Sequence, residues 1–262
     1  LVESPDVGIV GVGEGSTPSM QNFFQEIGVA DAEWMPQCNA TYKNGITFAN
    51  WTSIPGFEEY CHPFPSQMDS FTFSKFDANC QLRRHSYDVD AHPDRFFLGA
   101  YLSKNQKSPK ANHNFPFDQP YGYHFDSGLL GKFLAKKAQE RGVDYKQAHV
   151  ERVHQKQTGD ISRLDFKDGE SIEADFFVDC SGFAGVLIQK TLEVPFISFD
   201  KFLFNDTAIV APTPSNFDSL NSQTKSTALK YGWAWDIPLT SRTGNGYVFS
   251  SKHCSADDAE TE

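Results

Sequence analysis

The alternation of large and small residues around Lys43 predicts an extended strand with two unlike faces. In residues 40–51, ATYKNGITFANW, the large side chains Tyr42, Ile46 and Phe48 fall on one face. Lys43 falls on the other face, which it shares with the small residues Thr41, Gly45, Thr47 and Ala49. Two interpretations are open: a lysine on the solvent side of a half-buried strand, or an ammonium group with room beside it for a small ligand.

Helical periodicity is expected in three places. Thr17 and Pro18 suit the N-cap and first position of a helix whose apolar residues recur at positions 20, 23, 24 and 27, before Gly28 ends it. The run YHFDSGLLGKFLAKKAQERG predicts a second helix, which Asp126 can cap. A third helix is expected to begin near Val186, where a strand runs into the glycine-containing turn DCSG.

Period-two patterns predict two groups of strands. AHVERVHQK and ISRLDFKDG read as a meander that continues into SIEADFFVD, while KFLFNDTAIVA, YGWAWDIPL and GNGYVFSSK predict a separate antiparallel sheet. Residues 52–120 show no clear period and are predicted to be irregular. Nothing in the pattern fixes the acidic and histidine side chains of this stretch on one face, so a solvated loop is favoured and no metal is predicted for His85, Asp88, Asp90 and His92.

Composition favours a protein that acts on small molecules. The chain has 262 residues, a net charge of −11 and a pI near 5.1, which disfavours nucleic acid because such binding depends on Lys and Arg neutralising phosphates. No apolar run is long enough for a membrane helix. The five cysteines show no C-x-x-C spacing, so reduced thiols and a cytoplasmic location are expected.

Both ends read as cut: LVES resembles the end of a strand and SADDAETE the first turn of a helix, which predicts an internal segment.

Two features suggest a cofactor. Glu3 ends a strand, as does the carboxylate that holds a ribose hydroxyl in dinucleotide folds. GVGEGSTPSM is a glycine-rich loop that opens a helix, although its spacing is not the G-x-G-x-x-G of a pyrophosphate turn. Its backbone N–H groups could hold part of a cofactor, or the glycines could serve only a tight turn.

Five motifs, in order, resemble the flavin-dependent tryptophan halogenases. GWAWDIP matches the W-x-W-x-I-P signature of that family with Trp233, Trp235, Ile237 and Pro238. VGEGSTP resembles its V-G-E-A-T-x-P loop, CNATYKNGITFANW its lysine strand, YHFDSGLLGKFL its mid-chain helix and FVDCSGFAGVLI its second flavin-side turn. The resemblance covers the whole chain.

The resemblance implies a reaction and a role for Lys43. Reduced flavin and oxygen convert halide to hypohalous acid, and the lysine presents the electrophilic halogen, as a chloramine or by a hydrogen bond, to an aromatic ring. CHPF looks like the H-x-F pair of the family, which places His62 and Phe64 against the substrate ring. The residues implied to contact the flavin are Glu3, Gly13, Glu14, Gly15, Ser16, Thr17, Pro18, Val150, Asp179 and Gly182.

Departures from the family bear on the substrate. The segment after Phe64 is shorter than in the tryptophan enzymes and lacks the residues that frame the amino-acid end of tryptophan, and Ser16 stands where Thr is usual. The pyrophosphate turn, the halide-binding residues and the glutamate that partners the lysine are expected outside these 262 residues.

The expected architecture is a mixed α/β, flavin-monooxygenase-like FAD-binding fold with a β-rich substrate region, incomplete at both termini. Residues 1–262 are expected to form one such module, with flavin-side segments at about 1–50 and 121–192 and substrate-side segments at about 51–120 and 193–262.

Expected partners are FADH2 from a separate flavin reductase, a halide ion, a small aromatic substrate and a second copy in a homodimer. Alternative interpretations are a flavin monooxygenase of the same fold, against which the W-x-W-x-I-P match argues, and a non-catalytic flavin-binding remnant.

Overall fold

The computed structural model describes residues 1–11 and 14–262, without the side chain of Phe217. The chain divides into two compact units. The smaller combines Leu1–Ile9 with Leu134–Phe204, and the larger combines Val10–Phe133 with Asn205–Glu262. Each unit is described by itself.

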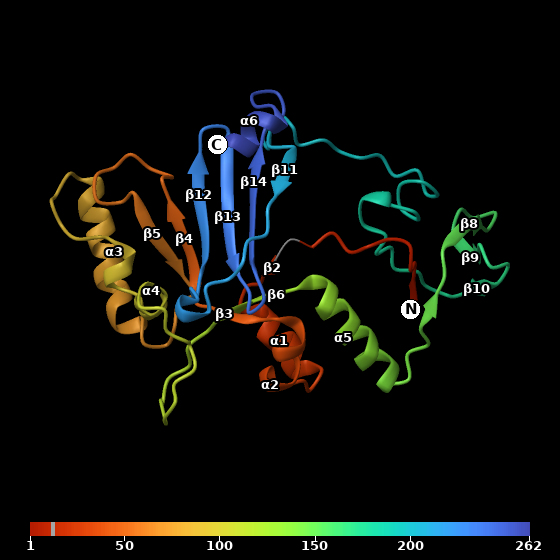
Figure 1. The fold of residues 1–262 in the computed structure, drawn as a ribbon, viewed down its shortest axis with the longest axis horizontal. Helices are drawn as coiled ribbons and strands as arrows, with labels where there is room; N and C mark the ends of the chain where they lie inside the picture. The colour runs from red at the N-terminus through yellow and green to blue at the C-terminus, as the bar shows by residue number, and fades with distance from the viewer. Residues whose placement is uncertain (12–13) are drawn as a thin grey trace. The chain divides into compact units, whose positions relative to one another are not determined.

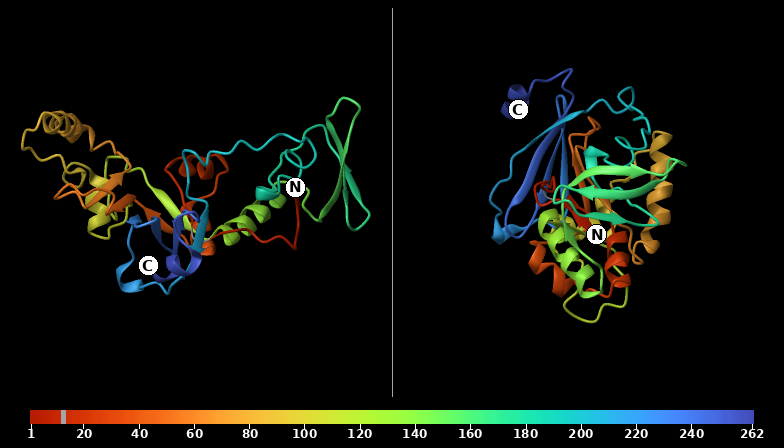
Figure 2. Two further views of the ribbon diagram at one scale, coloured as in Figure 1. Left: turned by 90° about the horizontal axis from the view of Figure 1, so that it is seen from above. Right: turned by 90° about the vertical axis from the view of Figure 1, so that its right-hand side faces the viewer.

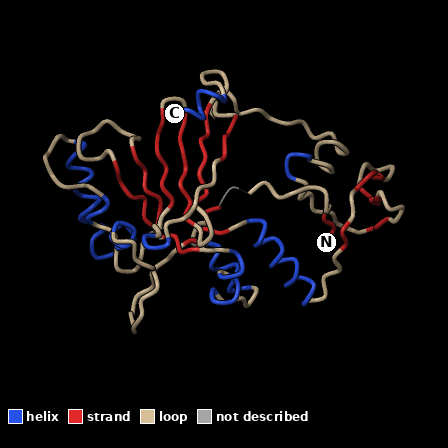
Figure 3. Tube along the Cα trace, in the orientation of Figure 1, coloured by secondary structure: helices blue, strands red, loops and turns tan. Residues whose placement is uncertain are grey.

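A six-stranded sheet forms the main layer of the larger unit (Figures 1 and 3). Its order is β11 (Thr207–Val210), β14 (Thr243–Phe249), β13 (Gly232–Pro238), β12 (Thr224–Leu229), β4 (Gly45–Ala49) and β5 (Glu59–Pro63). All neighbours are antiparallel except β12 and β4, which run parallel. The antiparallel arrangement predicted for the last third of the chain is confirmed, and β12 is an additional strand that the sequence pattern did not indicate.

A second, three-stranded sheet carries Lys43. Its order is β2 (Glu14–Gly15), β6 (Gly122–Phe125) and β3 (Thr41–Lys43), all antiparallel. Thr41 and Gly15 both pair with His124, and Lys43 pairs with Gly122, so these residues share one face of the sheet. Tyr42 pairs with Tyr123 on the opposite face.

The single strand predicted around Lys43 is therefore wrong, because Asn44 divides it between two sheets. The Asn44 side chain is fully buried and donates to the Lys107 carbonyl (2.8 Å) and to Ser222 Oγ (3.0 Å). Its backbone N–H donates to the Ser222 carbonyl (2.7 Å). These bonds turn the backbone away from the three-stranded sheet, and the chain continues as β4 in the six-stranded sheet.

The helices are α1 (Ser19–Glu26), α2 (Asp31–Trp34), α3 (Ser70–Arg84), α4 (Leu98–Lys104), α5 (Ser127–Glu140) and α6 (Ala256–Thr261), with short 3-10 turns η1 (Pro36–Cys38), η2 (Pro93–Arg95), η3 (Gly182–Ala184) and η4 (Phe217–Ser219). Asp126 caps α5 as predicted, since its Oδ1 accepts the Leu129 N–H (3.0 Å). The predicted Thr17 cap of α1 is wrong: the helix starts at Ser19, and the Thr17 hydroxyl pairs instead with the Ser19 hydroxyl (2.7 Å).

Residues 52–120 contain more structure than their sequence pattern indicated. β5, α3 and α4 all lie there, and none of the residues of α3 is buried, which explains why no amphipathic period was visible. Within the same stretch, Asp90 pairs with Arg95 (2.8 Å) and His92 accepts the Asp94 N–H.

The smaller unit is built on the predicted meander. β8 (Val150–Gln155), β9 (Ile161–Phe166) and β10 (Ser171–Glu173) form an antiparallel ribbon, drawn in green in Figure 2. β1 (Val2–Glu3) runs parallel to β7 (Lys146–Gln147). The core of this unit contains Ala148, Leu164, Phe166 and Leu187.

The third predicted helix, beginning near Val186, is wrong. Residues 186–192 form turns, because the Asp179 carboxylate accepts the backbone N–H groups of Leu187 (2.8 Å) and Ile188 (2.9 Å). Among the described residues, no helix is long and apolar enough to cross a membrane.

Candidate functional site

Lys43 is a buried cation at the edge of the three-stranded sheet. Only 5% of it is exposed, which contradicts the interpretation of a lysine on a solvated face. Burial lowers the Lys43 pKa to about 8. Among the described residues, no hydrogen bond or ion pair to its ammonium group is found. A substantial fraction of this amine is therefore neutral, and so nucleophilic, at a mildly alkaline pH.

Gly15 keeps the space beside the Lys43 amine open. A β-carbon built on Gly15 would lie 3.0 Å from Lys43 Nζ, 3.3 Å from Thr224 Oγ1 and 3.4 Å from His124 Cδ2. Gly15 itself is exposed, so the amine lies just beneath an accessible piece of backbone. His124 is fully buried, and its pKa is well below the usual range because of desolvation and the charge of Lys43.

Of the two predicted substrate residues, the structure brings Phe64 to Lys43. Phe64 is 9% exposed, and its ring centroid lies 5.9 Å from Lys43 Nζ. A hydrogen bond from the Phe64 N–H to the Asn44 carbonyl (3.3 Å) ties the end of β5 to the residue after the lysine. His62 lies on β5 opposite Ile46 and is exposed.

The glycine-rich loop predicted to contact the flavin runs past the lysine. The Ser16 N–H donates to the Tyr123 carbonyl (2.8 Å), which extends the pairing of β2 with β6. Glu14 Oε2 accepts the Ser127 N–H at the start of α5 (3.1 Å). Thr17 is exposed and Pro18 precedes α1 directly. The predicted contact at Gly13 lies outside the described residues.

The remaining predicted flavin contacts belong to the smaller unit. Glu3 is exposed, and its Oε2 accepts a hydrogen bond from the Tyr145 hydroxyl (2.6 Å). Val150 begins β8, and Gly182 begins η3 with φ of +62°. Desolvation, the largest single influence, raises the pKa of Asp179, but the hydrogen bonds from Ser181 and from backbone amides together lower that pKa to about 2. The structure thus shows Asp179 organising its own turn.

The tryptophan signature lies on β13. The rings of Trp233 and Trp235 are tilted, with centroids 6.1 Å apart, and Trp235 pairs across the ladder with Gly246, where a β-carbon would collide with its ring. Ile237 is buried with Trp235. The Pro238 carbonyl accepts a hydrogen bond from the Thr41 hydroxyl (2.7 Å), which connects the signature to the strand that carries Lys43.

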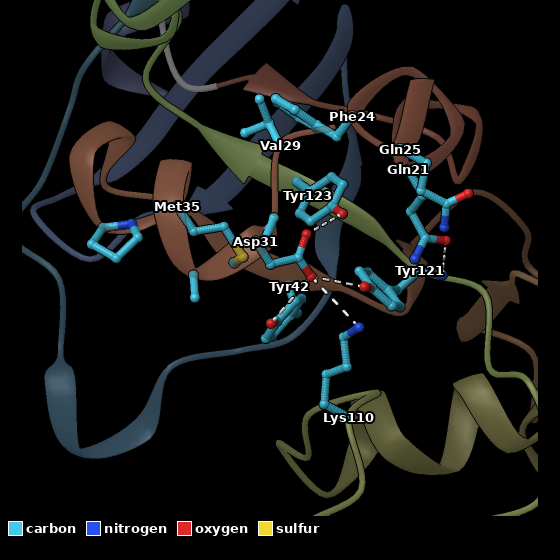
Figure 4. A pocket seen from close by; sticks show the side chains of 13 residues that line it. Gln21, Phe24, Gln25, Val29, Asp31, Met35, Tyr42, Lys110, Tyr121 and Tyr123 are labelled. Carbon is cyan, nitrogen blue, oxygen red and sulfur yellow. Dashed lines mark hydrogen bonds and ion pairs between the residues drawn. The ribbon is translucent and has the colours of Figure 1, made fainter. Parts of the chain in front are cut away.

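A cavity of about 560 Å³ lies on the tyrosine face of the three-stranded sheet and was not found from the sequence (Figure 4). Asp31 accepts hydrogen bonds from the hydroxyls of Tyr123 (2.7 Å), Tyr121 (2.8 Å) and Tyr42 (3.4 Å). The Lys110 ammonium lies 3.6 Å from the same carboxylate and 4.7 Å from the Tyr121 ring centroid. Burial first, and Asp31 second, raise the Tyr42 pKa to about 12.

Replacing Asp31 by Asn should destabilise the protein by about 2 kcal/mol, because hydrogen bonds to a charged acceptor contribute about 1.5–3 kcal/mol each and the amide can satisfy fewer of these donors. Urea unfolding measures the loss. The matched control is Asp77→Asn on the exposed side of α3, which should leave the unfolding midpoint unchanged. If the two substitutions lowered the unfolding midpoint equally, Asp31 would not stabilise the protein through its hydrogen bonds to the tyrosine hydroxyls.

Comparisons with solved structures show which class of proteins shares this fold. The structure matches the crystal structure of the tryptophan 6-halogenase SttH from Streptomyces toxytricini with a TM-score of 0.84 and 32% identity, over 99% of this chain and 54% of that one. It also matches BrvH, a flavin-dependent halogenase from Brevundimonas sp. BAL3, with a TM-score of 0.82 and 30% identity, over 99% and 52%. The predicted mixed α/β fold is therefore confirmed as that of the flavin-dependent halogenases.

The sequence comparisons agree with the structural ones. The tryptophan halogenase family model matches residues 1–262. SttH is 35% identical over 99% of this chain and 53% of its own length, and the tryptophan 7-halogenase RebH of Lentzea aerocolonigenes is 32% identical over 100% and 52%. The chain belongs to the tryptophan halogenase family. It spans about half the length of the curated relatives it matches.

Proposed function

We propose that the protein carrying this chain is a flavin-dependent halogenase of an electron-rich aromatic compound, such as tryptophan or another indole. The observation that carries the proposal is the buried Lys43 amine, which has a pKa of about 8 and makes no hydrogen bond or ion pair among the described residues, in a chain of the tryptophan halogenase family. The relatives named as tryptophan halogenases support the substrate class.

The residues present fit a flavin. Gly15 leaves accessible space over the lysine that a β-carbon would fill, and the exposed Glu3 carboxylate can accept hydrogen bonds from ribose hydroxyls. In the larger unit, Glu14 to Pro18 would contact a flavin. In the smaller unit, taken by itself, the turn organised by Asp179 would offer Gly182. When bound, reduced FAD would react with oxygen, and the product of that reaction would oxidise chloride or bromide to hypohalous acid. A separate flavin reductase would provide the FADH2.

The proposed chemistry of Lys43 is nucleophilic. Its neutral amine attacks the halogen of hypohalous acid, so that an N–halogen bond forms, the halogen–oxygen bond breaks and water leaves with one amine proton. The aromatic ring then takes the halogen and releases a proton, which restores the amine. Presentation of intact hypohalous acid by the ammonium group would require the protonated form, so the two routes have opposite pH dependence around pH 8.

Phe64 is proposed to hold the flat face of the substrate ring. Phe64→Ala should raise the KM for the aromatic substrate about tenfold, since an aromatic ring pair contributes about 0.5–1.5 kcal/mol beyond its buried area. Steady-state rates of product formation at several substrate concentrations give KM and kcat separately. Flavin oxidation is followed in parallel. Phe71→Ala is the control, because Phe71 on α3 is 72% exposed. An unchanged KM for Phe64→Ala would remove Phe64 from the substrate site.

The proposed function is tested on the full-length protein with a flavin reductase, NADH, oxygen, and chloride or bromide. Tryptophan, free indole and indoles with other side chains are offered in turn, and mass spectrometry detects the halogen isotope pattern of any product. Halogenation of at least one aromatic compound, dependent on flavin and halide, is expected. Oxygen consumption without halogenation of any compound would contradict the proposal.

A further inference from the structure

His124 links two sheets through the hydroxyl groups of two threonines. Its Nδ1 lies 3.0 Å from Thr41 Oγ1 on β3, and its Nε2 lies 3.0 Å from Thr224 Oγ1 on β12. His124 is fully buried and Thr224 is 9% exposed. A polar side chain buried to this degree is costly unless both ring nitrogens are satisfied, and here both are.

The contacts of Thr41 determine where the protons lie. The Thr41 hydroxyl has one proton, which it donates to the Pro238 carbonyl (2.7 Å). Thr41 Oγ1 must therefore accept from His124, so the proton of the neutral ring is on Nδ1. The bare Nε2 then accepts the proton of the Thr224 hydroxyl. Because that proton points at the ring, the oxygen lone pairs of Thr224 face away from His124.

The Thr224 hydroxyl and the Lys43 amine both lie beside Gly15. The position of a β-carbon on Gly15 lies 3.3 Å from Thr224 Oγ1 and 3.0 Å from Lys43 Nζ, so the two polar atoms border the same small space. Phe64 lies 5.9 Å from Nζ by its ring centroid, and His124 is an ionisable group near enough for the charge of Lys43 to help lower its pKa well below the usual range. Thr224 thus offers a free acceptor beside the same glycine as an amine that makes no hydrogen bond among the described residues.

We infer that Thr224 and His124 are positioning residues for Lys43: the Thr41–His124–Thr224 chain directs the Thr224 lone pairs away from the ring, so that they accept a Lys43 N–H when the flexible end of the lysine, which makes no hydrogen bond among the described residues, moves within reach. This inference rests on the proposed role of Lys43 and adds two residues to it. Accepting an N–H fixes the rotation of the amine, so that its nitrogen lone pair is directed at the incoming halogen. Through Pro238, the same chain connects the lysine to the W-x-W-x-I-P segment.

The activity test compares Thr224→Val, which keeps the shape and removes the hydroxyl, with Thr224→Ser, which keeps the hydroxyl. In the full-length protein, Thr224→Val should lower kcat for halogenation at least about tenfold, with the KM for the aromatic substrate and the rate of flavin oxidation unchanged. Thr224→Ser should stay within about twofold of the wild type. An unchanged kcat for Thr224→Val, in a protein that Lys43→Ala inactivates, would overturn the inference.

Two measurements are independent of turnover. Nitrogen-15 NMR of histidine-labelled wild-type protein, assigned with His124→Gln, should show His124 protonated at Nδ1 alone, and a proton at Nε2 would overturn the inference. The pH dependence of Lys43 labelling by an amine-reactive reagent should show a lower apparent pKa in Thr224→Val than in Thr224→Ser, because loss of an acceptor destabilises the ammonium form. Equal pKa values would likewise count against it.

These measurements separate the two proposals. If the wild-type protein halogenates nothing, the proposed function fails, while the NMR and labelling results still decide whether the hydrogen-bond chain exists. If the wild type is active and Lys43→Ala is inactive, but Thr224→Val matches the wild type in kcat and in the Lys43 pKa, only the positioning role fails.

Discussion

Lys43→Ala is expected to abolish halogenated product while leaving flavin oxidation and oxygen consumption intact. The loss should exceed about a hundredfold, which is the lower end of what a positioned acid, base or nucleophile contributes. The reason is that Lys43 is a buried amine and, in the proposed mechanism, acts after hypohalous acid has formed. Oxygen consumption, free hypohalous acid and halogenated product are measured on the same sample.

Two further substitutions give this experiment its controls. Lys43→Arg should also fail, because a guanidinium group stays protonated and cannot serve as the nucleophile. Lys104→Ala removes an exposed lysine from α4 and should leave the product yield unchanged. Halogenation that survives either substitution of Lys43 would exclude this residue from the mechanism.

The pH profile of the wild-type protein follows from the same burial. Desolvation lowers the Lys43 pKa to about 8, so the neutral fraction of the amine grows as the pH rises through that value. If the neutral amine is the nucleophile, the single-turnover rate of halogenation should rise with pH and level off above about 8. A rate that falls over this range would favour presentation of the halogen by the ammonium form.

The sequence drew attention to Lys43 but not to the residues that surround it. A lysine on a small-residue face was visible from local alternation, because side-chain direction along a strand depends on neighbouring positions alone. His124 and Thr224 were missed because their roles depend on contacts with Thr41 and with each other, 83 and 100 residues apart in the chain. No local period encodes that pairing.

Errors in the predicted elements have the same origin. The alternation around Lys43 continues past Asn44 without a break, but the Asn44 side chain bonds to Lys107 and Ser222, which local pattern cannot reveal. The expected helix near Val186 was displaced by hydrogen bonds to the Asp179 carboxylate. By contrast, α5, β8 and β9 were predicted well, since a capping residue, an apolar stripe and an Asp-Gly turn are local signals. The third predicted strand, SIEADFFVD, is wrong beyond Glu173, where β10 ends.

Gly15→Ala is expected to slow halogenation strongly although it leaves Lys43 in place. The added methyl would lie 3.0 Å from Lys43 Nζ and 3.3 Å from Thr224 Oγ1, so one of these atoms must move by a few tenths of an ångström. The flexible end of the lysine can yield, and the unfolding temperature should therefore change little. The rate of halogenation should fall, because displacing a reacting group by about 1 Å can lower the rate a hundredfold.

Comparing Gly15→Ala with Gly8→Ala separates the chemistry of the site from the general cost of replacing glycine. A β-carbon on Gly8 meets nothing within 4 Å, so Gly8→Ala should retain both stability and activity. Thermal unfolding and single-turnover halogenation are measured for both variants. Gly15→Ala should unfold within about 2 °C of the wild type, a shift that corresponds to about 1 kcal/mol or less, yet form product at least about tenfold more slowly. The space over the lysine would then be a requirement of the reaction rather than of the fold, whereas full activity in Gly15→Ala would show that the halogen reaches Lys43 by another route.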